Sequence, residues 1–343
     1  MKILFSSCRN PHFVTITEYI ESALRKEGEV LFFDDRDFVV PGRIRKRLSS
    51  LQRWDLSRIN NNLIRTIDKF KPDIFLEAGG HRILPRTVKK IGERGIKTIL
   101  WTIDPPRNFE PVIESAPFYD FVFCGGSEAI DILNKHNIKN IYFLPFACDP
   151  GYAYPVEVNK EEKEFYRSDV VFVGSYYPNR LEILEKITDF NLGVWGPGWD
   201  RISNNSPLKK CIRKAEGVDY KEWRKIYSSS KMALTIHYQD GKTICHQASP
   251  RVYEVLACKS FLLSDNQRDV VRLFEPRRYL DIFDNINDLR EKLNYYLKSP
   301  EKRRAIAECG YREVIKKHTY IHRVKEIFNI ARKGENNGKK RLL

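Results

Sequence analysis

The sequence has few of the features that mark secreted, fibrous or membrane-spanning chains. No apolar run approaches the roughly 20 residues that are needed to cross a bilayer, and no internal repeat indicates a solenoid or a fibre. The 7 cysteines are scattered, odd in number and without a C-x-x-C spacing. That distribution argues against a disulfide framework and a zinc site, so we expect a reducing, cytoplasmic environment.

The chain does have a large positive charge and enough apolar residues for two cores. Its 343 residues carry 60 Lys+Arg against 45 Asp+Glu, a formal net charge of +15, and 42% of them are hydrophobic. At about 150 residues per domain, this length predicts two domains. The excess of positive charge favours anionic partners, such as nucleic acid, anionic lipid headgroups or phosphorylated substrates.

Short apolar runs alternate with amphipathic stretches, which is typical of a parallel sheet covered by helices. In the first half the candidate strands are Lys2–Ser6, Val30–Phe33, Asp73–Glu77, Thr98–Ile103, Asp120–Cys124 and Asn140–Leu144. In the second half they are Asp169–Gly174, Asn191–Trp195, Lys231–Ile236, Phe261–Ser264 and Tyr279–Ile282. We therefore predict an α/β chain with two Rossmann-like, doubly wound domains that face each other across a cleft.

Three prolines and a charge cluster interrupt the pattern between Pro145 and Tyr166, and they mark a linker. We expect a first domain over residues 1–150, a linker over 151–168, a second domain over 169–318, a C-terminal helix over 319–331 that crosses back to the first domain, and an irregular basic tail over 332–343.

The segment Ser249–Asp265 predicts a helix start followed by a buried strand. Pro250 suits the first position of a helix, where free backbone N–H groups and the guanidinium of Arg251 can bind a diphosphate. Glu254 lies one turn further on the same face, where its carboxylate can accept hydrogen bonds from two ribose hydroxyls. Taken alone, the two residues are better explained by an i,i+3 ion pair on a solvated helix.

This segment resembles the nucleotide-sugar half of GT-B glycosyltransferases, and most of all the spore-maturation, CgeB-like branch. Further segments match that family in the same order along the chain: WTIDPP over 101–106, VFVGSYYPNR over 171–180, VWGPGW over 194–199 and HTYIHR over 318–323. The resemblance is best over residues 97–330. Two positions depart from the family pattern, since Lys259 replaces a glycine and His246 replaces a second glutamate that retaining relatives carry.

The resemblance implies a glycosyltransferase, of the hexosyl or a related kind, that moves a sugar from a nucleotide diphosphate to a hydroxyl of a glycan, lipid-linked or protein acceptor. It implies a UDP- or dTDP-linked donor and no other cofactor. We expect no metal, because a helix dipole and an arginine can neutralise the leaving diphosphate. The acidic cluster Asp34–Asp37 lies in the first domain, away from the expected donor site.

The donor is expected on the second domain. Gly174 allows the backbone to approach a phosphate, and Ser175 can donate a hydrogen bond to it. Gly198 is explained either by donor contact or by a tight turn over an apolar cluster. The full set of expected donor-binding residues is Gly174, Ser175, Arg180, Gly198, Val218, Ser249, Arg251 and Glu254.

The acceptor and its general base are expected on the first domain. Asp104 and His81 each follow a predicted strand, and a carboxylate or an imidazole can accept the proton of a hydroxyl. Asp104 is the first candidate because it belongs to the WTIDPP match, and His81 is the second. A turn residue before proline explains Asp104 equally well.

A basic strip precedes the third predicted strand; it consists of Arg43, Arg45, Lys46, Arg47 and Arg53. Ile44, Leu48 and Leu51 recur within it at helical spacing, which suits an anionic membrane surface at the inner face of the membrane. The alternative is a surface helix that packs Leu48 and Leu51 inward.

Two other function classes remain open at this stage. The positive charge would suit a nucleic-acid-binding protein, although no zinc-finger, RRM or helix-turn-helix signal makes such a partner expected. Two domains could also close around a nucleotide or a sugar without turnover.

Overall fold

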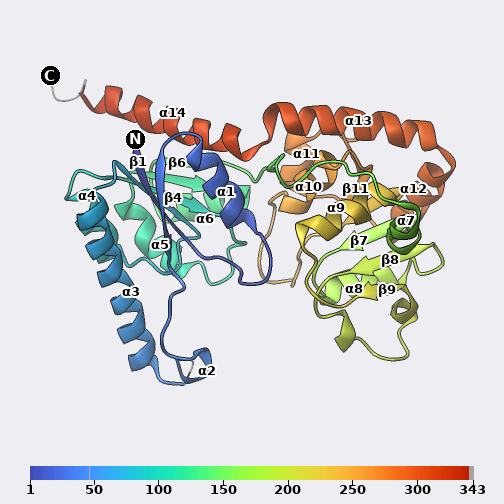
Figure 1. Ribbon diagram of the computed structural model, residues 1–343, viewed down its shortest axis with the longest axis horizontal. Helices are drawn as coiled ribbons and strands as arrows, with labels where there is room; N and C mark the ends of the chain where they lie inside the picture. Colours follow the sequence, from blue (N-terminus) through green and yellow to red (C-terminus); the bar gives the residue numbers. More distant parts are fainter. Residues whose placement is uncertain (46, 340–343) are drawn as a thin grey trace. The chain divides into compact units, whose positions relative to one another are not determined.

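The computed structural model describes residues 1–45 and 47–339, with side chains through Lys333, and divides into two compact units (Figure 1). Unit 1 comprises Met1–Asn10, Thr15–Pro145 and the chain from Arg323 onwards, and unit 2 comprises Pro11–Val14 and Phe146–His322. Each unit contains one six-stranded sheet in which all strands are parallel. The predicted class, an α/β chain with two doubly wound sheets, is confirmed.

The sheet of unit 1 has β1 and β3 near its centre. Its strand order is β2 (Glu29–Asp34), β1 (Lys2–Ser7), β3 (Ile74–Ala78), β4 (Lys97–Thr102), β5 (Phe121–Cys124) and β6 (Ile141–Phe143). The helices are α1 (Ile16–Arg25), α2 (Gly42–Arg45), α3 (Ser49–Phe70), α4 (Pro85–Gly92), α5 (Glu110–Ser115) and α6 (Ser127–Lys135). Leu4 and Phe75 pack against α3 and α4, while the alternate residues Ile3, Phe5 and Leu76 are also buried, so both faces of the sheet are covered.

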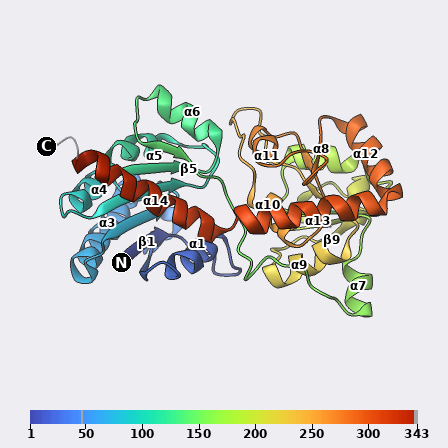
Figure 2. The ribbon, with the colours of Figure 1, turned by 90° about the horizontal axis from the view of Figure 1, so that it is seen from above.

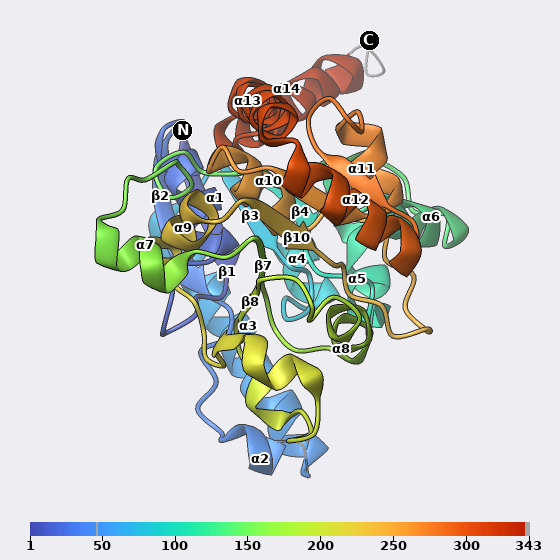
Figure 3. The ribbon, with the colours of Figure 1, turned by 90° about the vertical axis from the view of Figure 1, so that its right-hand side faces the viewer.

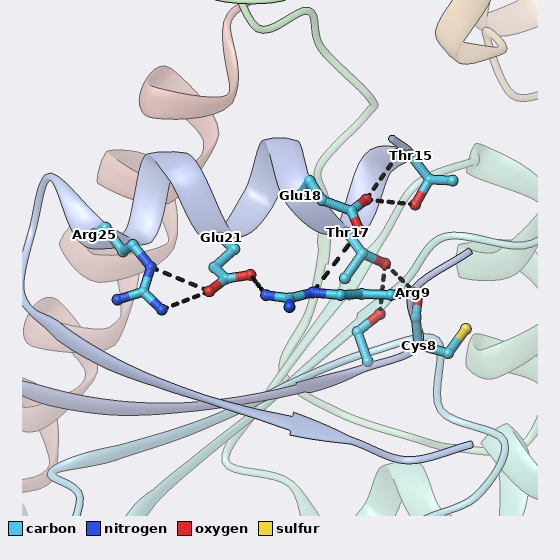
Figure 4. A network of polar contacts seen from close by, with 8 residues as sticks. Cys8, Arg9, Thr15, Thr17, Glu18, Glu21 and Arg25 are labelled. Carbon is cyan, nitrogen blue, oxygen red and sulfur yellow. Dashed lines mark hydrogen bonds and ion pairs between the residues drawn. The ribbon is translucent and has the colours of Figure 1, made fainter. Parts of the chain in front are cut away.

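Polar side chains tie the start of α1 to the end of β1. Figure 4 shows the network of Cys8, Arg9, Thr15, Thr17, Glu18, Glu21 and Arg25. The Thr17 hydroxyl donates to the Cys8 carbonyl over 2.8 Å, and the guanidinium of Arg9 pairs with Glu21. These contacts fix the carboxyl end of β1, the edge of the sheet at which ligands of open α/β folds bind.

The sheet of unit 2 has the same architecture with a different strand order. It runs β12 (Asp281–Phe283), β11 (Leu262–Asp265), β10 (Met232–Thr235), β7 (Val170–Val173), β8 (Leu192–Trp195) and β9 (Ile212–Lys214). Its helices are α7 (Lys160–Tyr166), α8 (Pro178–Glu185), α9 (Tyr220–Ser229), α10 (Pro250–Ala257), α11 (Arg268–Leu273), α12 (Ile286–Lys298) and α13 (Pro300–Lys317). Helix α13 lies against α10, and α12 lies beside α13 (Figures 2 and 3).

Strand β9, helix α7 and the length of helix α14 differ from the sequence-based expectations. Strand β9 was not expected, because a three-residue strand with two basic side chains has no apolar pattern. The expected linker contains α7, whose first turn is capped by the Asn159 side chain accepting from the Glu162 N–H over 2.8 Å.

The last helix, α14 (Tyr320–Lys339), continues past residue 331, where an irregular tail was expected. Its buried residues Val324, Ile327 and Phe328 belong to unit 1. A helix that is already held by such packing gains one backbone hydrogen bond for each residue added, so it extends into a segment of low helix propensity. Residues 340–343 lie outside the described part of the chain.

The turn after β3 is held by a buried carboxyl group. Glu77 accepts a hydrogen bond from the Gly80 N–H over 3.1 Å and another from the Tyr119 hydroxyl. Burial, together with the nearby charge of Asp35, raises the pKa of Glu77 to about 8. The turn itself needs glycine, because Gly79 has a φ of +126° and Gly80 a φ of +92°.

The free energy of unfolding of the native protein should fall as pH rises from 4.5 to about 8. We expect this fall to be absent in Glu77→Gln. The folded state holds a proton on Glu77 up to about pH 8, whereas the unfolded chain releases it near its ordinary pKa of 4.5. Folding therefore takes up a proton in that window, and Glu77 lowers the free energy of unfolding by up to about 1.4 kcal/mol for each pH unit. Urea unfolding at pH 5.5 and 8 measures this slope.

The exposed Glu93→Gln serves as the control, and its pH dependence should match that of the native protein. Parallel stability–pH curves for Glu77→Gln and the native protein would contradict the assignment of Glu77 as the buried proton carrier.

Candidate active site

In unit 2, the loop after β7 and the loop after β8 contact each other closely at glycine residues. The Gly174 N–H donates to the Trp195 carbonyl over 2.7 Å, and the Trp199 indole N–H donates to the Gly174 carbonyl over 2.8 Å. A Cβ atom on Gly196, whose φ is +131°, would lie 2.4 Å from the Gly174 carbonyl oxygen. Only glycine therefore permits this contact.

Gly198 supports the same turn. It has a φ of +89°, and a Cβ atom there would lie 3.2 Å from Tyr176. The rings of Tyr176 and Trp199 pack edge to face with their centroids 5.5 Å apart. The geometry is that of a tight turn over an aromatic cluster, the second of the two explanations considered for Gly198.

Two arginines converge on the loop that begins at Gly174. The guanidinium carbon of Arg251 lies beside Gly174, 3.1 Å from the position that a Cβ atom on Gly174 would take. Arg180 is buried and donates from Nη1 to the Ser175 carbonyl over 2.8 Å and from Nε to the Ile236 carbonyl over 2.9 Å. The structure thus brings together the predicted residues Gly174, Ser175, Arg180 and Arg251.

The two guanidinium groups act on each other electrostatically. Burial, followed by the charge of Arg251, lowers the pKa of Arg180 to about 9. Within the described residues, neither Arg180 nor Arg251 forms a salt bridge with a carboxylate. Like charges held together at low solvent access favour a bound anion, which would offset both the burial and the repulsion.

The start of α10 is positioned by a buried histidine that the sequence did not indicate. The Ser249 N–H donates to His237 Nε2 over 3.0 Å, and His237 Nδ1 lies 2.6 Å from Asp265 Oδ1. This pattern fits a neutral imidazole with its proton on Nδ1. The side-chain oxygen of Ser249 is buried and has no hydrogen-bond partner in the described part of the chain, so a ligand can use it.

One feature of the sequence could have identified His237 and Asp265 as candidate site residues. Each lies at or just after the carboxyl end of a predicted strand, and those strands are neighbours in the sheet. Their pairing depends on the register of β10 and β11, which single-sequence reasoning does not supply.

Glu254 lies one turn into α10 beyond Arg251. Burial raises the pKa of Glu254 to about 7, although the charge of Arg251 opposes the shift. Its charge also acts on Tyr227 of α9, whose pKa is raised by burial and then by Glu254. Val218, a half-buried residue, directly precedes the Asp219 cap of α9. The arrangement places a carboxyl group that can ionise near neutral pH one helical turn beyond Arg251, the arginine that contacts the Gly174 loop.

In unit 1, the structure brings the two predicted base candidates together. His81 Nε2 lies 3.6 Å from Asp104 Oδ2, although the two residues follow different strands. Asp104 is exposed, whereas His81 is half-buried behind the Gly79–Gly80 turn. Burial lowers the pKa of His81, with Asp104 opposing the shift. A neutral imidazole next to a carboxylate is a combination that can accept a proton from a hydroxyl.

The basic strip does not form the single helix that its spacing suggested. It is divided into the four-residue α2 and the start of α3, because Leu48 between them has an extended backbone with φ −120° and ψ 92°. Leu48 is 51% exposed, which corrects the alternative in which Leu48 packs inward; Leu51 is half-buried. Arg43, Arg47 and Arg53 are exposed and Arg45 is half-buried, while Lys46 lies outside the described residues.

The described residues contain neither a candidate membrane-spanning helix nor a candidate metal-binding cluster. No helix there is long and apolar enough to cross a membrane. No three or more His, Cys, Asp or Glu side chains come together there in a group that could hold a metal ion.

The chain is similar in sequence to a known family and to a known protein. Residues 180–329 match the sequence profile of the family described as glycosyl transferase-like. The chain is 20% identical over 266 residues to spore protein CgeB of Bacillus subtilis, an alignment that covers 74% of this chain and 81% of CgeB.

Solved structures show the same fold over almost the whole chain. Sucrose-phosphate synthase from Thermosynechococcus elongatus superposes with a TM-score of 0.72 at 11% identity, covering 98% of this chain and 99% of that one. HepE from Anabaena, in complex with UDP and glucose, superposes with a TM-score of 0.67 at 9% identity, covering 97% and 100%. With its two parallel sheets the chain has the GT-B fold of these solved structures, and its sequence is similar to the glycosyl transferase-like family over residues 180–329 and to CgeB over most of its length.

Proposed function

We propose that this glycosyltransferase moves a hexose or a related sugar from a UDP-linked donor to a hydroxyl acceptor, with the donor bound by unit 2 and the acceptor by unit 1. The observation that carries the proposal is the pair of guanidinium groups, Arg180 and Arg251, held beside Gly174 with no carboxylate partner among the described residues. The choice of UDP is supported by the UDP that HepE contains.

Each donor group has a partner of matching chemistry in unit 2. The diphosphate would lie at Gly174 and Ser175, near Arg251, Arg180 and the buried hydroxyl of Ser249. Glu254 would accept hydrogen bonds from the ribose hydroxyls in its ionised form. In this proposal the developing charge on the diphosphate is neutralised by the arginines and the start of α10, so that no metal is required.

The transfer itself is a substitution at the anomeric carbon. The oxygen of the acceptor hydroxyl forms a bond to that carbon, the bond from the carbon to the diphosphate oxygen breaks with its electron pair, and UDP leaves. The hydroxyl proton goes to His81, whose lowered pKa keeps the imidazole neutral at pH 7. Asp104 orients the imidazole and stabilises its protonated form. His81 is thus the proposed base and Asp104 a positioning residue.

Donor binding provides the first test. We expect Arg251→Ala to weaken the binding of UDP-glucose by at least tenfold, because a hydrogen bond to a charged group contributes about 1.5–3 kcal/mol. Titration calorimetry measures the effect. Arg213→Ala, at an exposed arginine of the same unit, should leave the affinity unchanged. Equal affinity in both variants would contradict the assignment of Arg251 to the diphosphate.

The ionisation of Glu254 gives a second readout of the same binding. Because the carboxylate has a pKa of about 7 and the ionised form accepts from both ribose hydroxyls, affinity for UDP-glucose should rise as pH increases through 7. Glu254→Gln should bind less tightly and show a flat profile. A native profile without this rise would remove Glu254 from the ribose site.

The base assignment is tested by UDP release at varied pH. We expect the kcat of His81→Asn to fall by about 10²–10⁴-fold and its profile to lose the acidic limb. Asp104→Asn should keep that limb but move it to lower pH, because Asp104 raises the pKa of His81. His136→Asn, at an exposed histidine, serves as the control. Normal turnover in His81→Asn would return the base role to Asp104.

We also propose that the basic strip holds the enzyme at an anionic membrane surface, on the cytoplasmic side. Four large apolar side chains around the strip are exposed: Val39 at 57%, Ile44 at 44%, Leu48 at 51% and Trp54 at 55%. They accompany the exposed Arg43, Arg47 and Arg53 near α2 and the start of α3 (Figure 3). Exposed apolar groups with adjacent basic ones suit an anionic lipid interface.

Sedimentation with vesicles tests this surface. We expect binding to vesicles that contain phosphatidylglycerol at low salt, little binding at high salt, and none to neutral vesicles. Arg43→Ala with Arg47→Ala should weaken binding at about 1 kcal/mol per charge, and Leu48→Ser with Trp54→Ser should weaken it without changing the salt dependence. Val271→Ser, at an exposed valine of unit 2, is the control. If short DNA binds instead and nucleotide sugars do not, the nucleic-acid alternative holds.

A further inference from the structure

Beside His81, unit 1 contains a pocket of about 380 Å³ that no step of the proposed transfer has yet used. Its lining includes three arginines, Arg36, Arg45 and Arg82, together with Phe38 and His81. These residues come from the loop after β2, from α2 and from the turn after β3. The pocket therefore lies at the carboxyl end of the sheet, next to the proposed base.

The charges in this pocket are only partly compensated. Arg82 donates from Nη1 to Asp35 Oδ1 over 2.9 Å. Arg36, in contrast, donates to the Cys8 sulfur over 2.8 Å, and Arg45 donates from Nε to the Val40 carbonyl over 2.9 Å. Across the described ranges, the guanidinium groups of Arg36 and Arg45 form no salt bridge with a carboxylate, and no carboxylate lines the pocket. The nearest acidic groups to Arg36 are Asp34, which accepts from the Arg36 backbone N–H over 2.8 Å, and Asp35, which Arg82 already pairs with.

The wall that carries Phe38 is held in place by a buried carboxylate. Asp55 is fully buried and accepts hydrogen bonds from the Val39 and Val40 N–H groups over 3.3 and 3.0 Å. These bonds fix the segment whose Phe38 ring lies 3.6 Å from the guanidinium of Arg45. Arg45 is thereby oriented by both its stacking on Phe38 and its bond to Val40, so its remaining N–H groups are available to a ligand.

We propose that the acceptor carries a phosphate ester, which Arg36 and Arg45 bind in this pocket while its hydroxyl faces His81. The inference rests on the proposed function, because it names the acceptor of that transfer. Guanidinium groups match the oxygens of a phosphate with paired hydrogen bonds, and Arg36 and Arg45 bring positive charge to a pocket that no carboxylate lines among the described residues. A neutral sugar would give these two guanidinium groups no anion to bind.

The test uses the whole protein with UDP saturating unit 2, so that added phosphate esters report on unit 1. We expect glucose 6-phosphate to bind at least tenfold more tightly than glucose in titration calorimetry. Arg36→Ala with Arg45→Ala should abolish that preference. The matched control is Arg65→Ala with Arg86→Ala, two exposed arginines of unit 1 that do not line the pocket. Glycerol 3-phosphate, the headgroup portion of a phospholipid, is titrated in parallel.

Comparing the affinities for glucose 6-phosphate and glycerol 3-phosphate shows which kind of phosphate ester the pocket prefers. Preference for glucose 6-phosphate supports a soluble sugar phosphate as the acceptor, and preference for glycerol 3-phosphate supports a lipid acceptor. An anion preference that survives in Arg36→Ala with Arg45→Ala, or the absence of any preference, overturns the proposal. The NMR signals of His81 give an independent readout, since a phosphate in the pocket should raise its pKa in the native protein alone.

Failure of this inference is distinguishable from failure of the proposed function. If UDP-glucose binds and UDP is released with neutral acceptors only, the transferase stands and the phosphate acceptor is wrong. If phosphate esters bind through Arg36 and Arg45 but no nucleotide binds at all, the anion pocket stands without the transferase, and the proposal of an acceptor site is overturned.

Discussion

Parallel strand order constrains where this chain can place its chemistry. In each sheet the carboxyl ends of the strands meet at one edge, so polar residues that follow separate strands become neighbours there. His237 and Asp265 pair after β10 and β11, and His81 and Asp104 come within 3.6 Å after β3 and β4. Both of these pairs depend on this one constraint.

Charges on partly or fully buried residues are costly in free energy. The two units differ in how such charges are compensated. In unit 1, Glu77 takes up a proton, and Asp35 pairs with Arg82. In unit 2, the guanidinium groups of Arg180 and Arg251 converge on the Gly174 loop and form no salt bridge with a carboxylate among the described residues. A group that is neutralised within the protein stabilises a turn, whereas one that is left uncompensated favours a ligand of opposite charge.

In unit 2, glycines allow the backbone of one loop to come close to another loop and to Arg251. Gly196 lies against the Gly174 carbonyl at a distance that no Cβ atom could occupy, and the Arg251 guanidinium fills the space beside Gly174. The arginine therefore stands next to bare backbone, where a phosphate can approach both. Fold and proposed site are linked here, because the contact between the two loops also shapes the surface that we propose for the diphosphate.

The sequence by itself determined the alternation of strands and helices, the two-sheet fold and the motif around Arg251 and Glu254. These follow from local patterns, since apolar periodicity and helix-start residues are encoded within about 20 neighbouring positions. Only the tertiary structure decided that His81 and Asp104 are partners, that Glu77 keeps its proton and that Leu48 is exposed. Each of these depends on strand register, burial or long-range packing, which bring together residues that are distant in the sequence.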